Sequence, residues 1–417
     1  MNIDLQRWID RWAGIPLCAA VSGVDAVTRL FKKKPITKTD VAVAPRAIVI
    51  ILLSEMGSLV LAHDMFARLK TRYPNAELHA LLFGKNREIL DLMQVIKPEH
   101  VHTVDDKSLM GLLSSLWRSV MQLRRANVDV AIDCELFSRI SSLLSYFSGA
   151  SVRVGFHRHT QEGLYRGSHI NKPVPYNPYQ HISAQFLTLA RAIDSTAVPK
   201  SKLQVMLPTQ APPQVQLEPG LVISIQMRLA QDFPSISGKP LVLVYPGGGI
   251  LPIRAWPLES YTALCNGLVQ DGCAVAVIGL KDDQTLAQQL VANVKNVNSD
   301  SPVIDLTGYT RSVAELLALF HVARLLVTND GGPGQFAALT PIWTIMLFGP
   351  ETPALYAPLT PKCHSFYSQW PCSPCLTAYN HRNSFCDGDN QCLKVITPEA
   401  VLKKSREFLA GEFLVAA

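Results

Sequence analysis

The stretch from Leu326 to Pro350, LVTNDGGPGQFAALTPIWTIMLFGP, constrains the fold of this chain most. Two apolar runs bracket a polar, glycine-rich turn that carries one carboxylate, Asp330. Apolar runs of this length are typical of buried parallel strands. Pro333 suits the first turn of a helix, where its missing N–H is not needed. The stretch therefore predicts a strand, a turn, a helix and a second strand.

The glycines of this turn indicate an anion site. Gly331, Gly332 and Gly334 leave backbone amides open to a diphosphate at the positive end of the helix. Glycine turns also follow strands in α/β proteins without binding anything. From these residues alone, a ligand site and a plain turn both stay open.

The rest of the chain repeats the alternation of apolar runs and helical segments. Such alternation predicts α/β domains in which helices cover both faces of a parallel sheet. We expect two Rossmann-like domains facing across a cleft, at 46–205 and 206–417, after an N-terminal extension at 1–45, with the proline-rich segment Pro199–Pro219 as linker. Strands are predicted at Ala47–Leu53, Leu78–Phe83, Val128–Ile132, Leu241–Tyr245, Val275–Ile278, Val303–Leu306, Leu325–Val327 and Thr344–Phe348.

Composition and charge exclude several classes of protein. A hydrophobic content of 48% excludes a disordered chain. The net charge is +6, but residues 1–46 hold eight Lys or Arg against four Asp, so the remainder is close to neutral. That balance argues against a nucleic-acid partner. No apolar run reaches the roughly 18 to 20 residues that span a bilayer, and we expect a cytoplasmic protein.

The extension has an amphipathic helical pattern. Its large apolar side chains precede the basic run Lys32-Lys33-Lys34. Two interpretations are open: an interfacial helix on an anionic membrane, or a helix docked on the protein's own surface. The apolar residues are Trp8, Trp12, Ile15, Leu17, Val21, Val24, Leu30 and Phe31.

Three segments together carry a resemblance to a known family. They are Asn329–Pro333, Phe336–Leu339 and Leu347–Pro350. This pattern resembles the sugar-nucleotide motif of glycosyltransferase family 9, the heptosyltransferases, over the span from about Ala47 to Leu409. The resemblance implies a GT-B fold and inverting transfer of a sugar without a required cofactor. The implied donor is a nucleotide sugar, ADP-heptose, and the implied acceptor is an anionic glycolipid, the lipopolysaccharide core or a related glycan, reached by peripheral contact with the cytoplasmic face of the inner membrane.

The resemblance also suggests residues that bind the donor. Gly248 lies in a second glycine turn after a strand, and Arg254, just before a Trp-Pro pair, would hold the diphosphate with its guanidinium. Asp283, with Asp282 as a rival, would meet the ribose hydroxyls. The alternatives are a solvated arginine and ordinary helix-start carboxylates.

Two positions in the opening motif need separate treatment. Asp330 repels phosphate, so we expect it to cap the helix, orient the amides or meet a sugar hydroxyl. Gln335 stands where family members commonly have His. Gln donates a hydrogen bond but supplies no positive charge.

The catalytic base differs more strongly from the family pattern. Members typically have Gly-Asp after the first strand, whereas Gly57 is followed here by Ser58. Serine does not serve as a base at neutral pH. We hypothesise that Glu55, three residues earlier, replaces the missing Asp. The alternative is a solvated loop residue.

For the acceptor, the sequence offers two regions. Glu135 and Arg139 follow the strand at Val128–Ile132, although a pair four residues apart is also ordinary helix support. A basic segment comes next and indicates either a loop that binds an acidic sugar or phosphate, or a solvated loop. It contains Arg153, His157, Arg158, His159, Arg166, His169 and Lys172, of which His157 and Arg158 are the candidates.

Cysteines gather in the segment 363–392. The spacing of Cys372, Cys375, Cys386 and Cys392 fits a four-thiolate structural zinc site, and a structural role without metal is the alternative. No catalytic metal is expected.

The predicted function is a glycosyltransferase, and two alternatives remain. A non-catalytic sugar-nucleotide or glycan-binding protein is favoured by Ser58 and Gln335. A sugar-nucleotide epimerase would turn over the donor without an acceptor. A nicotinamide dehydrogenase is disfavoured, because SEMGS follows the first strand instead of GxGxxG.

Overall fold

The structure, a computed structural model, describes residues 3–31, 44–53, 55–136, 138–157, 165–198, 212–377 and 384–411. The chain divides into two compact units, Met1–Pro208 and Thr209–Ala417. The predicted boundary at 205–206 and the candidate Arg158 lie outside the described residues.

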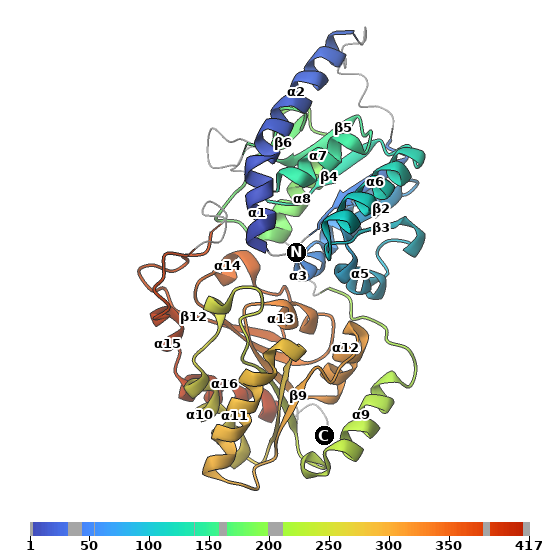
Figure 1. Cartoon of the computed structure of the whole chain (residues 1–417). Coiled ribbons are helices and arrows are strands. Elements are labelled where there is room, and N and C mark those ends of the chain that lie inside the picture. Colours follow the sequence, from blue (N-terminus) through green and yellow to red (C-terminus); the bar gives the residue numbers. More distant parts are fainter. Residues whose placement is uncertain are drawn as a thin grey trace. The chain divides into compact units, whose positions relative to one another are not determined.

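Unit 1 is built on a six-stranded sheet with the order β3-β2-β1-β4-β5-β6 (Figure 1). All five strand pairs are parallel. The central strand β1, AIVII, is buried along its whole length, as a strand covered on both faces must be. Its elements are α1 (Ile3–Trp12), α2 (Gly14–Phe31), β1 (Ala47–Ile51), α3 (Met56–Leu61), α4 (His63–Arg72), β2 (Glu77–Phe83), η2 (Gly84–Asn86), α5 (Arg87–Met93), η3 (Pro98–His100), β3 (Val101–Val104), α6 (Leu109–Arg125), β4 (Val130–Asp133), α7 (Arg139–Phe147), β5 (Val152–Phe156), β6 (Lys172–Val174) and α8 (Ile182–Ala192).

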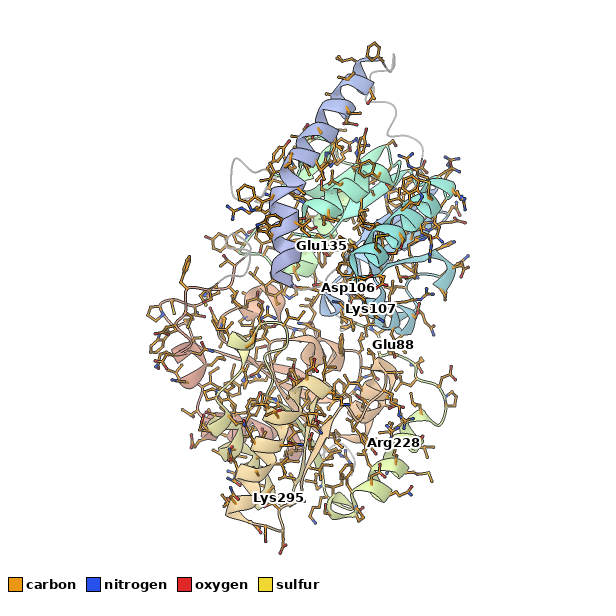
Figure 2. All side chains as sticks on the ribbon, in the orientation of Figure 1. Glu88, Asp106, Lys107, Glu135, Arg228 and Lys295 are labelled. Carbon is orange, nitrogen blue, oxygen red and sulfur yellow. The ribbon has the colours of Figure 1, made fainter. Side chains whose placement is uncertain are left out.

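Unit 2 has a second parallel six-stranded sheet, with the order β12-β11-β10-β7-β8-β9. Helix α9 packs on α12, where Arg228, labelled in Figure 2, pairs with Glu315 at 2.8 Å. The elements are α9 (Leu221–Asp232), η4 (Pro234–Ile236), β7 (Leu241–Tyr245), η5 (Pro252–Arg254), α10 (Leu258–Gln270), β8 (Ala274–Gly279), η6 (Lys281–Asp283), α11 (Gln284–Val297), β9 (Val303–Thr307), α12 (Val313–Val322), β10 (Leu325–Asn329), α13 (Gly332–Ala337), β11 (Trp343–Phe348), α14 (Pro353–Tyr356), β12 (Cys363–Tyr367), α15 (Gln391–Lys394) and α16 (Pro398–Gly411).

The two sheets share a topology that predicts where ligands bind. In each sheet the strand order reverses between two central strands, β1 and β4 in unit 1 and β7 and β10 in unit 2. Loops that leave such strands at their carboxyl ends diverge to opposite faces of the sheet and open a crevice there. The loops after β1 and β4 carry Glu55 and Glu135, and those after β7 and β10 carry Gly248 and Asp330.

All eight predicted strands are present, but four strands are not predicted by the sequence. They are β3, β5, β6 and β12. Strands β3, β6 and β12 are edge strands of three to five residues, where burial on both faces is incomplete. Strand β5 carries Arg153 among its apolar residues, which breaks the apolar run.

The N-terminal extension folds as two helices, one face of which docks on unit 1. Asp10 in α1 accepts hydrogen bonds from the backbone N–H groups of Arg139 (2.8 Å) and Ile140 (3.0 Å) and so caps α7 from another helix. Asp25 in α2 pairs with Arg153 at 3.0 Å. The docked-helix interpretation is therefore correct for this face.

The predicted basic segment is not a surface loop throughout. Arg153, Arg166 and His169 are all buried. Arg166 pairs with the buried Asp133 and donates to the carbonyls of Ser138 and Phe156. The sequence predicted either a loop that binds an acidic sugar or phosphate or a solvated loop. Both predictions are wrong for these three residues, because buried carboxylates and carbonyls of unit 1 supply their partners.

Candidate functional site

In unit 2 the site is organised by Asn329, the last residue of β10. Its amide nitrogen donates to the carbonyl oxygens of Pro246 (3.1 Å) and Gly247 (2.9 Å) in the loop after β7. Its amide oxygen accepts from the backbone N–H of Trp256 (3.0 Å) and the hydroxyl of Tyr261 (3.1 Å). One buried side chain thereby fixes the loops at the switch point, the place between β7 and β10 where the strand order reverses.

The loop that Asn329 fixes brings Arg254 between two carboxylates. The Arg254 Nη2 atom lies 2.8 Å from Glu351 Oε2, and its Nε atom lies 3.4 Å from Asp330 Oδ2. Only 14% of the arginine side chain is exposed, so it is not the solvated residue of the alternative interpretation. Burial alone would lower the pKa of Arg254, but Asp330 and Glu351 raise it, and the guanidinium stays charged.

Glu351 has unusual protonation chemistry. It is 3% exposed and directly follows Pro350 after β11. Burial, reinforced by Asp330, raises the pKa of Glu351 to about 8, although Arg254 acts in the opposite direction. At neutral pH Glu351 is therefore mostly protonated, and Arg254 retains positive charge that an anionic ligand can use.

Three buried polar atoms of this region have no hydrogen-bond partner. They are Arg254 Nε, Asp330 Oδ2 and Gln335 Oε1. The amide nitrogen of Gln335 donates to the carbonyl of Tyr356 at 2.7 Å, so the side chain is held while its oxygen stays available. Arg254 Nε and Asp330 Oδ2 face each other at 3.4 Å as an ion pair, so Gln335 Oε1 is the atom of the three that is left for a group of the ligand.

The expectation that Asp330 caps the following helix is wrong. The N-cap residue of α13 is Gly331, and no side chain caps this helix. The Asp330 carboxylate lies against Arg254 instead, because the opposite charge of the buried guanidinium compensates its burial. It orients the arginine.

The glycines of the opening motif have different reasons to be glycine. A Cβ at Gly334 would lie 2.8 Å from Met346 Sδ, so packing requires glycine there. A Cβ at Gly331 would meet no atom closer than 3.9 Å, and at Gly332 none closer than 3.4 Å. These two positions leave room above the turn. Helix α13 spans only six residues, so Arg254, rather than the helix dipole, is the main positive charge.

Asp283 and Gly248 belong to neighbouring turns at the same edge of the sheet. The Asp283 carboxylate accepts the backbone N–H of Leu280 at 2.8 Å and forms no side-chain cap on α11. A Cβ on Gly247 would lie 2.9 Å from Asp283 Oδ1, so the turns after β7 and β8 touch. A Cβ on Gly248 would lie 2.7 Å from the carbonyl oxygen of Leu251, which makes glycine obligatory in this turn.

In unit 1, Glu55 and Ser58 form a pair. The Ser58 hydroxyl donates to Glu55 Oε2 at 2.9 Å, and Glu55 precedes α3 in an extended conformation. Both residues are half-buried. Ser58 therefore orients the Glu55 carboxylate, which suits a base better than a freely rotating loop side chain does.

Glu135 lies beyond the end of β4 and is labelled in Figure 2. Its Oε1 atom accepts the backbone N–H of Leu53 at 2.7 Å, and the carbonyl of Leu53 accepts from Asn86 at 2.7 Å. These bonds connect the loops after β1 and β4 and hold the segment that leads to Glu55.

Arg139 and His157, the other acceptor candidates described, have partners other than those of Glu135. The Arg139 side chain is buried, pairs with Asp10 at 3.4 Å and donates to the carbonyl of Tyr165 at 3.0 Å. His157 is half-buried at the end of β5, and its backbone N–H donates to Val174. The described partners of Arg139 all belong to unit 1.

The four candidate zinc cysteines are reduced and gather in one region. Burial raises the pKa of Cys392 to about 11, and Cys375, Cys372 and Cys386 add to the effect, which places their thiols in its neighbourhood. Within the described residues, however, the only group of three or more metal-ligating side chains with ligand atoms within 4.8 Å of one another is Glu77, His79 and His100.

Sequence reasoning missed Asn329 and Glu351 as site residues. Asn329 ends an apolar strand and Glu351 follows the next strand of the sheet, so both meet at its carboxyl edge. A carboxylate immediately after a buried strand is the signal that points to Glu351.

Comparisons with known proteins agree with this geometry. Residues 116–384, more than half of the chain, match glycosyltransferase family 9 (heptosyltransferase). The chain is 25% identical to lipooligosaccharide heptosyltransferase 2 of Haemophilus ducreyi over 319 residues, which cover 75% of this chain and 86% of that protein.

Two solved structures show the same fold. The structure of Escherichia coli ADP-heptose lps heptosyltransferase II superposes with a TM-score of 0.67 and 21% identity over 88% of this chain and 99% of that chain. E. coli heptosyltransferase WaaC with ADP-2-deoxy-2-fluoro heptose superposes with a TM-score of 0.57 and 15% identity over 87% of this chain and 99% of that chain.

The fold and the match define a glycosyltransferase with two α/β domains of the GT-B type. The chain belongs to glycosyltransferase family 9, the heptosyltransferases. The predictions of the family, the fold class and the enzyme class are thus confirmed. Within the described part of the chain, no helix combines the length and hydropathy that crossing a bilayer requires.

Proposed function

We propose that the protein transfers heptose from ADP-heptose to a lipopolysaccharide core with inversion at the anomeric carbon. The observation that carries this proposal is the buried Arg254, held by Asp330 and Glu351 at the switch point of the unit 2 sheet. Two relatives support the donor and the acceptor: the ADP-heptose lps heptosyltransferase II of E. coli and the lipopolysaccharide heptosyltransferase 2 of Salmonella typhimurium.

Arg254 binds the diphosphate of the donor in this proposal. Its guanidinium offers two parallel N–H donors to phosphate oxygens, and protonated Glu351 leaves its charge available. Amides at Gly331 and Gly332 approach the same oxygens, since neither position is filled by the protein. Gly248 shapes the opposite turn, Asp283 meets the ribose, and Gln335 offers its unpaired oxygen to a sugar hydroxyl.

Glu55 acts as the base. It removes the proton from the acceptor hydroxyl as the hydroxyl oxygen attacks the anomeric carbon. The bond between that carbon and the diphosphate oxygen breaks, and ADP leaves with the electron pair. Ser58 orients Glu55, and Arg254 stabilises the charge that develops on the leaving diphosphate. Glu135, His157 and Arg158 remain the predicted contacts of the anionic acceptor, whereas the buried Arg139 side chain is bound to Asp10 and to the carbonyl of Tyr165.

The exposed face of the N-terminal helices contacts the membrane in this proposal. Helix α2 lies along α7, and its C-terminal end projects from unit 1 (Figure 1). Asp10 and Asp25 face inward to arginines, while the outward face carries large apolar side chains and Arg11. Such a face suits an anionic lipid surface. The exposed apolar residues are Trp8, Trp12, Ile15, Leu17, Val24, Val27, Leu30 and Phe31.

Vesicle flotation tests this contact. The full chain should float with vesicles that contain anionic lipid, and the double variant Trp8→Ser/Trp12→Ser should remain in the lower fraction. The variant Trp117→Ser, which removes an equally exposed tryptophan from α6, is the matched control and should float like the unaltered chain. Equal flotation of all three proteins would contradict the assignment of this face.

A structural zinc ion at Cys372, Cys375, Cys386 and Cys392 is also part of the proposal. The gathering of the four thiols around Cys392 supports it. Metal analysis of the purified protein and of a Cys372→Ser/Cys375→Ser variant checks it. Equal zinc content in both would exclude these thiols as ligands.

The main experiment combines a transfer assay with donor-binding calorimetry. Purified protein is incubated with ADP-heptose and lipopolysaccharide that lacks core heptose, and the glycolipid is analysed by mass spectrometry. A product heavier by one heptose supports the proposal. Donor binding without transfer to any core acceptor supports the non-catalytic alternative, and donor turnover without acceptor supports the epimerase.

A further inference from the structure

A second cluster of ligating side chains lies in unit 1, away from Glu55. Glu77 begins β2, His79 follows two residues later, His100 ends η3 and His102 lies in β3. These positions are at the amino ends of two adjacent parallel strands, whereas Glu55 follows the carboxyl end of β1. The cluster therefore has no part in the transfer reaction.

Three of these side chains converge closely. Ligand atoms of Glu77, His79 and His100 all lie within 4.8 Å of one another. The rings of His79 and His100 stack with centroids 4.3 Å apart, and His79 Nε2 lies 3.8 Å from Glu77 Oε2. His79 is buried, while the Glu77 side chain is 60% exposed. The cluster therefore has one side chain held in the interior and an opening to solvent.

A chain of hydrogen bonds fixes the tautomer of His79. The Gln122 Oε1 atom lies 3.0 Å from His102 Nδ1 and accepts its hydrogen. In neutral His102 the Nε2 atom then has a lone pair, which accepts from His79 Nδ1 at 3.2 Å. In neutral His79 the lone pair is therefore on Nε2.

That lone pair faces an unfavourable environment. His79 Nε2 is buried without a hydrogen-bond partner, and the Glu77 carboxylate lies 3.8 Å from it. Two electron-rich atoms that approach each other without a hydrogen between them repel, and a cation removes the repulsion. The hydrogen bond on the other ring nitrogen is the arrangement that orients histidine ligands in metal sites.

We propose that Glu77, His79 and His100 bind one divalent transition-metal ion of the zinc class, with water completing its coordination. Two imidazole nitrogens and one carboxylate oxygen suit zinc and exclude calcium or magnesium, which prefer oxygen ligands alone.

The ion would connect β2 to the turn that precedes β3. Strand β3 is four residues long and is the edge strand of the sheet, so it has a hydrogen-bonded neighbour on one side only. A bond from the metal to His100 would hold the start of this strand. The expected consequence of binding is greater stability of unit 1 with no change in the transfer reaction.

Metal titration of the full-length protein tests the site. The protein carries Cys372→Ser and Cys375→Ser, which remove two of the four thiols of the proposed cysteine site. It is depleted with a chelator and titrated with Zn²⁺ at pH 7 by calorimetry and thermal unfolding. We expect one Zn²⁺ per chain and a higher Tm. With Co²⁺ we expect weak d–d absorption and no thiolate charge-transfer band.

Variants identify the ligands. His100→Asn, at a half-buried position, should lower the Zn²⁺ affinity at least tenfold and abolish the Tm gain. Gln122→Ala should lower the affinity by about ten- to a hundredfold, because it removes the hydrogen bond that fixes the tautomer of His102 and, through His102, that of His79. His63→Asn removes a histidine outside the cluster, which lies 3.7 Å from Asp64, and this variant should bind Zn²⁺ like the parent protein.

Two results would overturn the proposal. One is the absence of Zn²⁺ binding by the parent protein. The other is an equal affinity and an equal Tm gain in the parent protein and in both His100→Asn and Glu77→Gln, which would place the bound ion elsewhere.

Discussion

Donor binding should weaken above pH 8 because Glu351 ionises there. The carboxyl group is buried beside Arg254, and its pKa is raised to about 8, first by burial and then by Asp330. Below that pH the group is neutral, and Asp330 is the other carboxyl group beside Arg254. Above pH 8, the two carboxylates beside Arg254 carry more negative charge than the guanidinium carries positive charge. The diphosphate of the donor then meets net negative charge.

The size of the effect follows from the pKa. If only the protonated form binds ADP-heptose, the apparent KM for the donor is multiplied by one plus ten to the power of pH minus 8. That factor is about 1.1 at pH 7, about 2 at pH 8 and about 11 at pH 9. The esterified diphosphate has no ionisation in this range, so the change belongs to the protein.

Steady-state kinetics with varied donor between pH 7 and 9 measure this dependence. Glu351→Gln should give a KM that stays flat over the range. Glu315→Gln is the matched control, since Glu315 also pairs with an arginine at 2.8 Å in unit 2 but has a lowered pKa and stays ionised throughout. A flat profile in the unaltered enzyme, or a rise retained in Glu351→Gln, would refute the reasoning.

Glu351 also predicts the direction of a stability change. Its pKa is higher in the folded chain than the ordinary 4.5, so the folded state holds this proton more tightly. The contribution to the free energy of unfolding is complete below pH 4.5 and is lost as pH rises through about 8. Urea titrations at pH 5 and pH 8.5 should therefore show a larger loss for the unaltered chain than for Glu351→Gln.

The remaining predictions concern the catalytic base, the glycines of the turn after β10, and the contact between helix α1 and unit 1. Glu55→Gln should lower kcat by about 10² to 10⁴ with donor affinity unchanged in calorimetry, and Ser58→Ala should have a smaller effect; full activity of Glu55→Gln would exclude it as the base. Gly331→Ala should raise the donor KM without changing Tm. Gly334→Ala should lower the free energy of unfolding by about 1–3 kcal/mol, because the added methyl group meets Met346. The reverse pattern would argue against a phosphate-binding turn. Asp10→Ala should cost about 3–5 kcal/mol in urea unfolding, because it leaves the buried Arg139 without its carboxylate partner. A loss under about 1 kcal/mol would give the pair the weight of a surface contact.

The strands and turns of the site could be predicted because their signals are local. Strand β10 begins with the apolar run Leu325–Val327 and is entirely buried, and the glycines that follow it indicate a turn. Arg254 and Asp330 were both predicted to lie at the donor site. Their mutual contact was not, since 75 residues separate them and only the pairing of β7 with β10 brings their loops together.

Buried ion pairs were the main failure of sequence reasoning. Arg153 and Arg166 stand in a segment rich in basic residues, which is typical of a solvated loop. Their partners, Asp25 and Asp133, are 128 and 33 residues away in sequence. No periodicity within the segment distinguishes an arginine that faces water from one that faces a distant buried carboxylate, because both have the same local neighbours.

The N-terminal helices show why two interpretations of one pattern need not exclude each other. An α-helix repeats every 3.6 residues, so one helix presents separate faces to separate surroundings. Asp10, Cys18 and Asp25 lie on the face that docks on unit 1, while Trp12 and Phe31 are exposed. A carboxylate in an otherwise apolar and basic helix is unfavourable at an anionic membrane. The two aspartates that pair with arginines of unit 1 therefore mark the docked face, and the apolar residues that do not share this face are the ones left for a lipid surface.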